Sequence, residues 1–294
     1  MLLRLIVSVL SSLLFYQHSY GSNLKEISFA LDSPYIYSWL QSNSSDLNTV
    51  EKRIPTPTGF KRVPVANNSF EAWLRNLPLK EKGSKVMLYN GEPKYRQDVH
   101  EAVVDIDIGK TDLQQCADAV MRLRAEYLYA TKQYNQISFN FTNGQAISYS
   151  EWRKGNKIVF KNNKAVWVPD SIDKTGYQSF KKYYNLIFAY AGTYSLSQEL
   201  ESVSNLKDIK AGDVFIYGGF PGHAVIVIDV VQNQKGEKYF LIAQSYMPAQ
   251  SIHILKNNAN PDLSPWYSLS EIKREMKIYT PEWTFEVSDL KRFK

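Results

Sequence analysis

The stretch that decides the fold is Gly212–Val230, which reads GDVFIYGGFPGHAVIVIDV. An apolar run at 214–217 is followed by a Gly/Pro turn and by a nearly continuous β-branched run at 224–230. Short apolar runs bounded by turn residues are typical of buried strands. His223 stands where the turn enters the second strand, so we expect its ring at the rim of a central sheet. A histidine held there suits a general base, although from this stretch alone a structural role is the more common one.

The composition bounds the class of protein. The chain has 294 residues, of which 44% are hydrophobic and 22% charged, and its formal net charge is +6. These values are typical of a globular protein with one large domain or two small ones. The positive charges are dispersed, so we expect no nucleic-acid partner. We expect a single α+β domain at 59–294, preceded by an irregular segment at 22–58.

The first 21 residues have the pattern of a secretory signal peptide. Arg4 precedes an apolar run at 5–16, and a small-residue site follows at 19–21. We expect cleavage after Gly21 and export to the periplasm or out of the cell. Because no later run approaches the length of a membrane span, we expect no transmembrane segment after cleavage.

The sequence contains one cysteine, Cys116, so no intrachain disulfide can form. A lone thiol in an exported protein is a liability unless it is buried or used. The apolar pattern predicts a helix from Asp112 to about Ala130, with Thr111 and Gln114 as its capping box and Cys116 on its core-facing stripe. The partial positive charge of a helix N-terminus favours a thiolate near that end.

A hairpin connects His223 with a second polar residue. The strand that begins at His223 is followed by a polar loop and by an apolar strand that ends at Gln244. A loop centred between residues 233 and 234 would place these two side chains opposite each other on one face, whereas a loop centred at 235–236 would change the register. We expect the helix of Cys116 to pack on that same face. A thiolate, a base and a group that fixes the base are the parts of an activated nucleophile.

This arrangement resembles a known group of enzymes. Its features are Gln115–Cys116 opening a core helix, Gly212–Asp213 before a strand, Gly222–His223 opening the next strand, and Gln244 ending the one after. In order and spacing they resemble the CHAP and NlpC/P60 amidases, which are papain-like hydrolases of the bacterial cell wall. The resemblance covers about residues 100–250 and implies a papain-like core at about 100–255. It implies Cys116 as nucleophile, His223 as base, Gln244 as the group that orients the base, and Gln115 as an oxyanion donor.

A second resemblance covers the chain as a whole. It lies in CADAVMRLRAEYLY at 116–129, FTNG at 141–144 and QSYMPAQ at 244–250. These stretches resemble a family of exported bacterial proteins, the domain of unknown function 4846. That resemblance implies no activity.

Two functions from different classes follow from these patterns. The leading hypothesis is an exported cysteine hydrolase that cleaves amide bonds in peptidoglycan stem peptides, so its partner would be a cell-wall peptide or glycopeptide. The alternative is a non-catalytic envelope protein that binds a cell-wall fragment or a partner protein. A reactive thiol of low pKa at Cys116 would favour the enzyme, and an inert thiol would favour the binding protein.

Other residues offer rival sites. His100 could replace His223 as the base, and His253 could line the same cleft, although a surface position on a strand is more common for such a residue. Asp105 and Asp107 could join the histidines in a metal site, but no metal-binding spacing supports this, so we expect neither metal nor cofactor. Three tryptophans could form a sugar-stacking cleft, although ordinary packing is the more common role for such residues. They are Trp152, Trp167 and Trp266.

Overall fold

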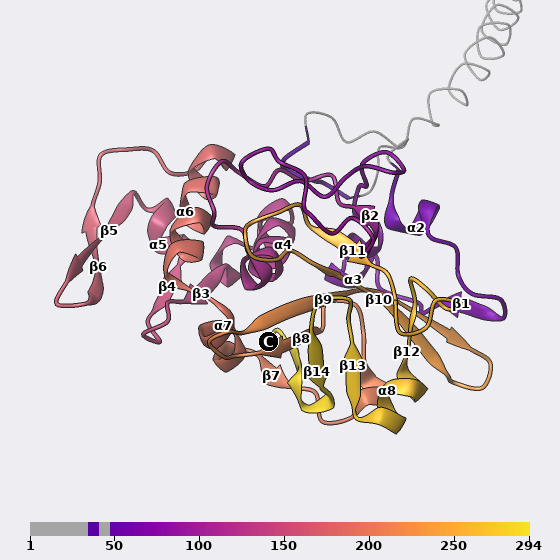
Figure 1. Ribbon diagram of the computed structural model, residues 1–294. Helices are drawn as coiled ribbons and strands as arrows, with labels where there is room; N and C mark the ends of the chain where they lie inside the picture. The colour runs from indigo at the N-terminus through magenta and orange to yellow at the C-terminus, as the bar shows by residue number, and fades with distance from the viewer. Residues whose placement is uncertain (1–34, 41–47) are drawn as a thin grey trace, which may run out of the picture.

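The computed structural model describes residues 35–40 and 48–294. The expected signal peptide at 1–21, and part of the segment at 22–58, lie outside the described residues. The protein has a mixed α+β fold in which helices pack on a large antiparallel sheet (Figure 1). None of the helices in the described ranges has the length and hydropathy that crossing a bilayer requires.

The elements are as follows. The strands are β1 (Phe60–Arg62), β2 (His100–Val103), β3 (Ser138–Asn140), β4 (Ala146–Ser148), β5 (Asn156–Lys161), β6 (Lys164–Pro169), β7 (Glu201–Ser202), β8 (Val214–Tyr217), β9 (His223–Asn233), β10 (Lys238–Gln244), β11 (His253–Leu255), β12 (Tyr267–Ser268), β13 (Lys277–Tyr279), β14 (Thr284–Glu286) and β15 (Leu290–Arg292). The α-helices are α2 (Val50–Arg53), α3 (Phe70–Arg75), α4 (Cys116–Ala130), α5 (Tyr149–Arg153), α6 (Tyr177–Tyr190), α7 (Thr193–Glu199) and α8 (Leu269–Glu275).

The central sheet draws on more of the chain than the sequence suggested. Its strand order is β2-β11-β10-β9-β8-β15-β7, and β1 and β12 pair in addition with β9 and β10. The expected sheet at about 100–255 is present, but β1 precedes it, and β12 and β15 follow it. The C-terminal tail therefore belongs to the sheet, because β15 pairs with β8.

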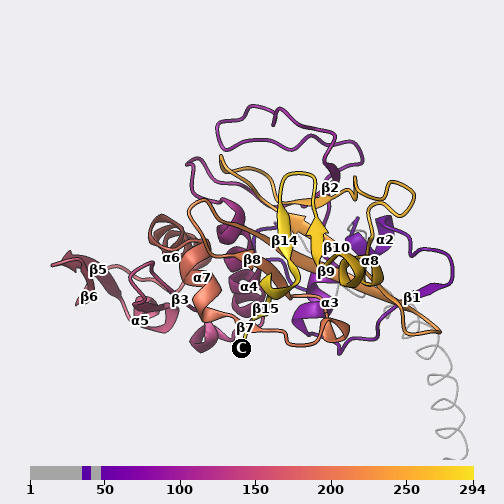
Figure 2. The same ribbon diagram turned by 60° about the horizontal axis from the view of Figure 1, so that its bottom comes forward.

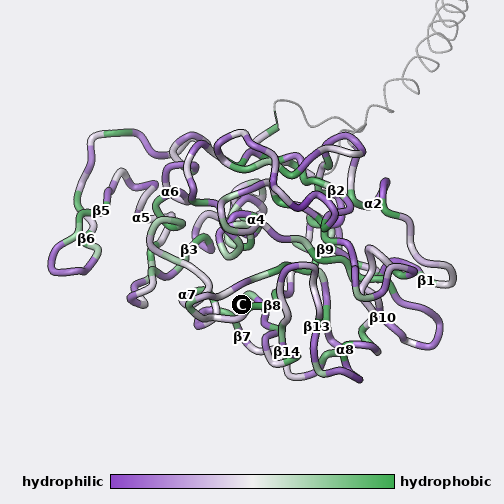
Figure 3. Tube along the Cα trace, viewed as in Figure 1, coloured by the Kyte–Doolittle hydropathy of each residue, from purple (hydrophilic) through white to green (hydrophobic). Residues whose placement is uncertain are grey.

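The strand β9 separates two hydrophobic layers. Side chains alternate between the two faces of a strand. Ala224 and Ile226 belong to the cluster that contains the apolar residues of α4, whereas Val225 and Val227 pack with Phe285 of β14. In Figure 1, α4 lies above β9, and the β13–β14 hairpin lies below it. The hydropathy colouring of Figure 3 shows β9 running through the hydrophobic centre of the molecule.

A β-bulge in β9 sets which side chains share a face. Val230 pairs with Phe240 and Val227 with Ile242, so β9 has one more residue than β10 in this interval. The extra residue, Ile228, interrupts the alternation of side chains along β9. Each residue before Ile228 therefore points to the face opposite to the one it would occupy in a regular strand. Because of this reversal, the first residue of β9 lies on the face of Phe240 and Ile242.

The predicted register of this hairpin was wrong, although its main consequence holds. The loop is centred at Lys235, because the Asn233 backbone N–H donates to the Glu237 carbonyl at 3.0 Å. His223 and Gln244 are therefore not directly opposite each other. The loop centre and the bulge together offset them by two positions along the strands. An offset of two keeps both side chains on one face.

The helix α4 begins later than predicted. It starts at Cys116 rather than at Asp112. The expected capping box of Thr111 and Gln114 does not form, because the Gln114 side-chain oxygen accepts a hydrogen bond from the buried guanidinium of Arg122. The sequence pattern did not reveal this competing partner.

A different cap fixes the start of α4. Gln115 is the N-cap residue, and its backbone N–H donates to Oδ2 of Asp118 at 3.0 Å. Asp112 lies in the preceding loop, where its Oδ1 accepts the backbone N–H of Ala249 at 2.6 Å. Cys116 therefore occupies the first helical position, where the backbone N–H groups of the first turn are free of intrahelical partners.

The chain between α4 and β8 forms an insertion beside the sheet. Its first part is a hairpin formed by β3 and β4. A second hairpin, β5–β6, projects away from the sheet, and α6 connects it back to the core (Figures 1 and 2). This insertion supplies α6 and α7, which border the site described next.

Candidate active site

The sulfur of Cys116 lies where α4 meets the beginning of β9. The side chain is 8% exposed. Burial raises the pKa of the thiol to about 11, and the nearby carboxylate of Asp118 adds to this rise. The backbone N–H groups of Ala117 and Ala224 are hydrogen-bonded to the sulfur and lower the pKa in part. The thiol is thus neutral at rest, but two N–H dipoles already point at the position of a thiolate.

Cys116 opens onto a pocket of about 400 Å³. The start of α4, the end of α6, the start of α7, the β8–β9 turn and Met247 form its wall. Phe220 and Met247 at the rim are 83% and 65% exposed. The acidic lining residues are Asp112 and Asp118, and none of the lysines or arginines in the described part of the chain lines the pocket. The pocket therefore suits an apolar or cationic group better than an anion.

His223 is the first residue of β9 and is buried. Its Nε2 lies 2.8 Å from Oε1 of Gln244. The amide orientation follows from the other end of Gln244, where Nε2 donates to Oε2 of Glu282 at 2.7 Å. Because an amide oxygen can only accept, Nε2 of His223 carries the proton, and Nδ1 is left as the basic nitrogen. Burial, and to a smaller extent the charge of Lys94, lowers the pKa of His223 to about 4, so the imidazole is neutral at pH 7.

The two candidate catalytic residues approach β9 from opposite faces. The ring of His223 packs on Phe285 and Trp283, with ring centroids 5.7 and 5.4 Å away. The expectation that α4 packs on the face of His223 was wrong, because α4 covers the face of Ala224. The sulfur of Cys116 nevertheless reaches the backbone N–H of Ala224, the residue directly after His223. The sulfur and the His223 ring therefore lie at the same end of β9, at its first residues, and on opposite faces of the strand.

The side-chain amide of Gln115 already has a hydrogen-bond partner. Its Nε2 donates to Oδ1 of Asp112 at 3.2 Å. It lines the pocket beside Cys116. To act as an oxyanion donor, its amide would first have to leave Asp112.

A charged pair that the sequence pattern does not reveal lies behind Gln244. Lys94, in the loop before β2, forms an ion pair with Glu282 at 2.5 Å. Glu282 lies in the β13–β14 turn, 38 residues after Gln244, and no sequence pattern connects the two. His253 was expected at the surface, but it is fully buried, and its Nε2 lies 3.4 Å from Nε2 of Gln244.

The rival residues serve other contacts. His100 places its Nε2 3.1 Å from the Ser84 carbonyl oxygen. Asp107 forms ion pairs with Arg122 at 2.6 Å and with Lys181 at 2.7 Å. Within 35–40 and 48–294, no group of three histidine, cysteine or acidic side chains is arranged to hold a metal ion.

Two of the three candidate tryptophans are packed into the structure. Trp152 is buried, and the Lys174 ammonium lies 4.0 Å from its ring centroid. Trp266 is buried as well and donates its Nε1–H to the Pro55 carbonyl at 3.0 Å. A sugar cleft built from Trp152 and Trp266 is therefore excluded.

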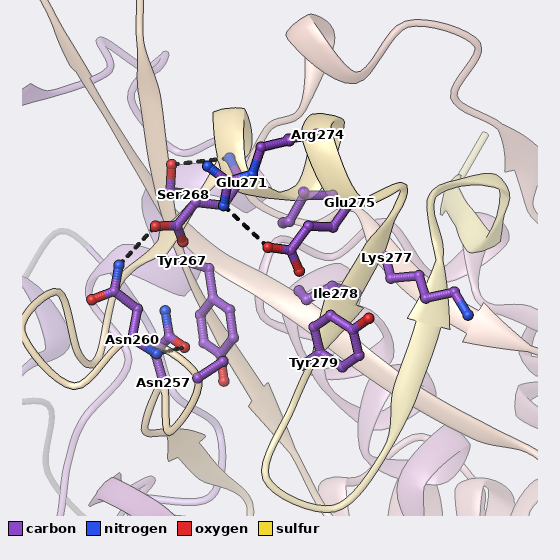
Figure 4. A pocket seen from close by; sticks show the side chains of 12 residues that line it. Asn257, Asn260, Tyr267, Ser268, Glu271, Arg274, Glu275, Lys277, Ile278 and Tyr279 are labelled. Carbon is purple, nitrogen blue, oxygen red and sulfur yellow. Dashed lines mark hydrogen bonds and ion pairs between the residues drawn. The ribbon is translucent and has the colours of Figure 1, made fainter.

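A separate pocket lies between α8 and β13 (Figure 4). Its polar side chains are bonded to one another, as in the 2.7 Å hydrogen bond from Asn260 to Glu271 and the ion pair of Arg274 with Glu275. None of the predicted site residues lines it. It offers no chemistry comparable to that around Cys116.

Comparison with known proteins places the chain in one family. Neither a curated protein nor a solved structure matches it. A family model, the domain of unknown function 4846, matches residues 50–292. This match spans most of the chain and includes Cys116, His223 and Gln244. The protein therefore belongs to the family of the domain of unknown function 4846.

Proposed function

We propose that this protein is an exported cysteine hydrolase with a papain-like core that cleaves amide bonds. The observation that carries the proposal is the position of the Cys116 sulfur. It lies at a helix N-terminus and against the N–H of Ala224, the residue that follows His223 in β9, and the Nε2–H of His223 is held by Gln244. The candidate nucleophile therefore lies at the same end of β9 as the candidate base and the group that would orient this base.

The chemistry follows from the neutral resting state. The thiol proton passes to Nδ1 of His223 as the sulfur attacks the carbonyl carbon of the substrate. The imidazolium returns this proton to the leaving nitrogen as the carbon–nitrogen bond breaks, and a thioester remains. Water, deprotonated by His223, hydrolyses the thioester, releases the acid and restores the thiol. Gln244 keeps Nε2–H of His223 in place throughout.

The pocket lining supports a substrate class. The exposed apolar rim at Phe220 and Met247, together with Asp112, favours a peptide with an apolar or cationic group next to the scissile bond. We propose stem peptides of peptidoglycan as the substrate, and a cell-wall peptide or glycopeptide as the partner.

One observation favours the alternative, a non-catalytic envelope protein that binds a cell-wall fragment or a partner protein. Burial of Cys116 raises the pKa of the thiol instead of lowering it. A thiol that is only packed in the core would have this property and no reactivity.

Alkylation of Cys116 tests the two functions against each other. We expect iodoacetamide to modify the folded wild-type protein at pH 7 at least about tenfold faster than the His223→Ala variant, because only a nearby base can remove the proton of so weak an acid. The His100→Ala variant is the matched control and should react like the wild type. Incubation with purified stem peptides should release new amino groups, and the Cys116→Ala variant should release none.

Equal and slow alkylation of the wild type and the His223→Ala variant, with no amino groups released, would contradict the hydrolase proposal. The binding function would then be tested by cosedimentation with cell-wall material.

A further inference from the structure

We propose that Glu282 is a positioning residue that fixes the orientation of the Gln244 amide and, through it, the tautomer of His223. The hydrogen bonds of Gln244 that are involved exist in the resting protein, without substrate. Its catalytic consequence rests on the proposed function.

The two ends of the Gln244 amide have different partners. Oε1 faces Nε2 of His223 at 2.8 Å, and Nε2 faces Oε2 of Glu282 at 2.7 Å. An ionised carboxylate can only accept a hydrogen bond, so it binds the amino end of the amide and turns the oxygen end toward the histidine. Charge-assisted hydrogen bonds of this length are stronger than neutral ones, so the preference for one orientation is marked.

His253 supports the same orientation. Its Nδ1 lies 2.8 Å from the Ser251 carbonyl oxygen, so Nδ1 carries the proton and Nε2 is an acceptor. That acceptor lies 3.4 Å from Nε2 of Gln244, on the same side as Glu282. Two acceptors thus face the amino end of the amide.

Lys94 holds the carboxylate in place. Its ammonium forms a 2.5 Å ion pair with Oε2 of Glu282, and the two side chains are 8% and 11% exposed. The same ammonium lies 5.4 Å from the ring centroid of Tyr246, whose ring also contacts that of His223. The pair therefore links the loop before β2 and the β13–β14 turn to the wall of the histidine site.

A reversed amide would change the chemistry of His223. The amino end of Gln244 would then face Nε2 of His223, which would have to give up its proton in order to accept. The proton would move to Nδ1, and the nitrogen that receives the thiol proton in the proposed mechanism would no longer be basic. Glu282 thereby acts on Cys116 through two intervening side chains, without touching the substrate.

The tautomer can be measured without any substrate. In protein labelled with ¹⁵N-histidine, the ring nitrogens of His223 are assigned by their loss in the His223→Ala variant. We expect the wild type to carry the proton on Nε2, and the Glu282→Gln variant to show a shift of population toward the Nδ1–H form. Cys116 alkylation in this variant should slow about tenfold, less than the roughly 10²-fold that complete loss of a positioned base costs, because only part of the His223 population changes its tautomer. An unchanged His223 spectrum in a folded Glu282→Gln variant would overturn the inference.

Two further variants separate positioning from support of the fold. Glu71→Gln removes a Glu–Lys ion pair with Lys210, between α3 and the loop before β8, and should leave the His223 tautomer unchanged. If Glu282→Gln does not fold, the double variant Lys94→Gln/Glu282→Gln removes both charges, leaves no unpaired buried ammonium and should show the same tautomer shift.

The outcomes also distinguish this inference from the proposed function. A tautomer shift with no hydrolysis by the wild type would retain the role of Glu282 and reject the hydrolase. Hydrolysis by the wild type with an unchanged tautomer in the variants would retain the hydrolase and reject the role of Glu282.

Discussion

Replacing Asp229 with alanine is expected to lower the free energy of unfolding by about 3–5 kcal/mol. Asp229 lies in β9 directly after the bulge residue and is fully buried. It forms ion pairs with Arg62 of β1 and, at 2.8 Å, with Arg75 of α3. Because Arg75 is itself buried, the variant leaves a guanidinium in the interior without its counter-charge.

Asp213 provides the matched control for Asp229. It is equally buried, but its partner Arg292 is 32% exposed. When Asp213 is replaced by alanine, Arg292 can turn into water, so we expect a smaller cost, about 1–3 kcal/mol. Urea unfolding at pH 7 measures both variants. Equal losses in the two variants would show that the Asp229 network contributes no more than an ordinary partly exposed ion pair.

The protein is expected to lose stability in acid because it buries neutral histidines. Burial lowers the pKa of His223 to about 4 and that of His253 to about 3. In the unfolded chain both histidines become protonated near pH 6.5. Between pH 6.5 and the pKa values of the folded protein, the unfolded chain therefore binds more protons than the folded chain. Stability is therefore fully present above about pH 6.5 and falls as the pH drops through this window, by about 3 kcal/mol for His223 alone.

The contribution of one histidine can be isolated with His253→Gln. Buried carboxyl groups with a raised pKa, such as Asp118 and Glu199, shift stability in the opposite direction over part of this range. The difference between wild type and variant at each pH removes their effect. We expect the variant to lose less stability than the wild type between pH 7 and pH 4 in urea unfolding. Parallel curves would contradict the assignment of a buried neutral His253.

The sequence predicted the local elements of the site better than their relation in space. The β-branched run after His223 specified a buried strand, since few other structures accommodate such a run. The start of α4 was misplaced because its cap depends on Asp118, and because Gln114 binds Arg122 through tertiary contact. Periodicity contains no information about such partners.

The register of the β9–β10 hairpin and the role of Glu282 were beyond sequence reasoning for different reasons. The register depends on where the loop closes and on an extra residue at Ile228, and both are set by packing on two faces. Glu282 reaches Gln244 only because β13 and β14 fold back under the sheet. His253 was misjudged because its burial depends on pairing with β2, which is distant in sequence.

The bulge at Ile228 gives a rule for comparing members of this family. His223 precedes Asp229 by six positions, and the bulge lies between them. A relative that lacks the extra residue has five positions in this interval and an unbroken alternation, so its histidine stays on the face of its glutamine. A relative with six positions keeps that face only if it also keeps the bulge. Among relatives that retain the histidine–glutamine pair, an even spacing in an alignment is therefore expected to mark a bulged strand and an odd spacing a regular one.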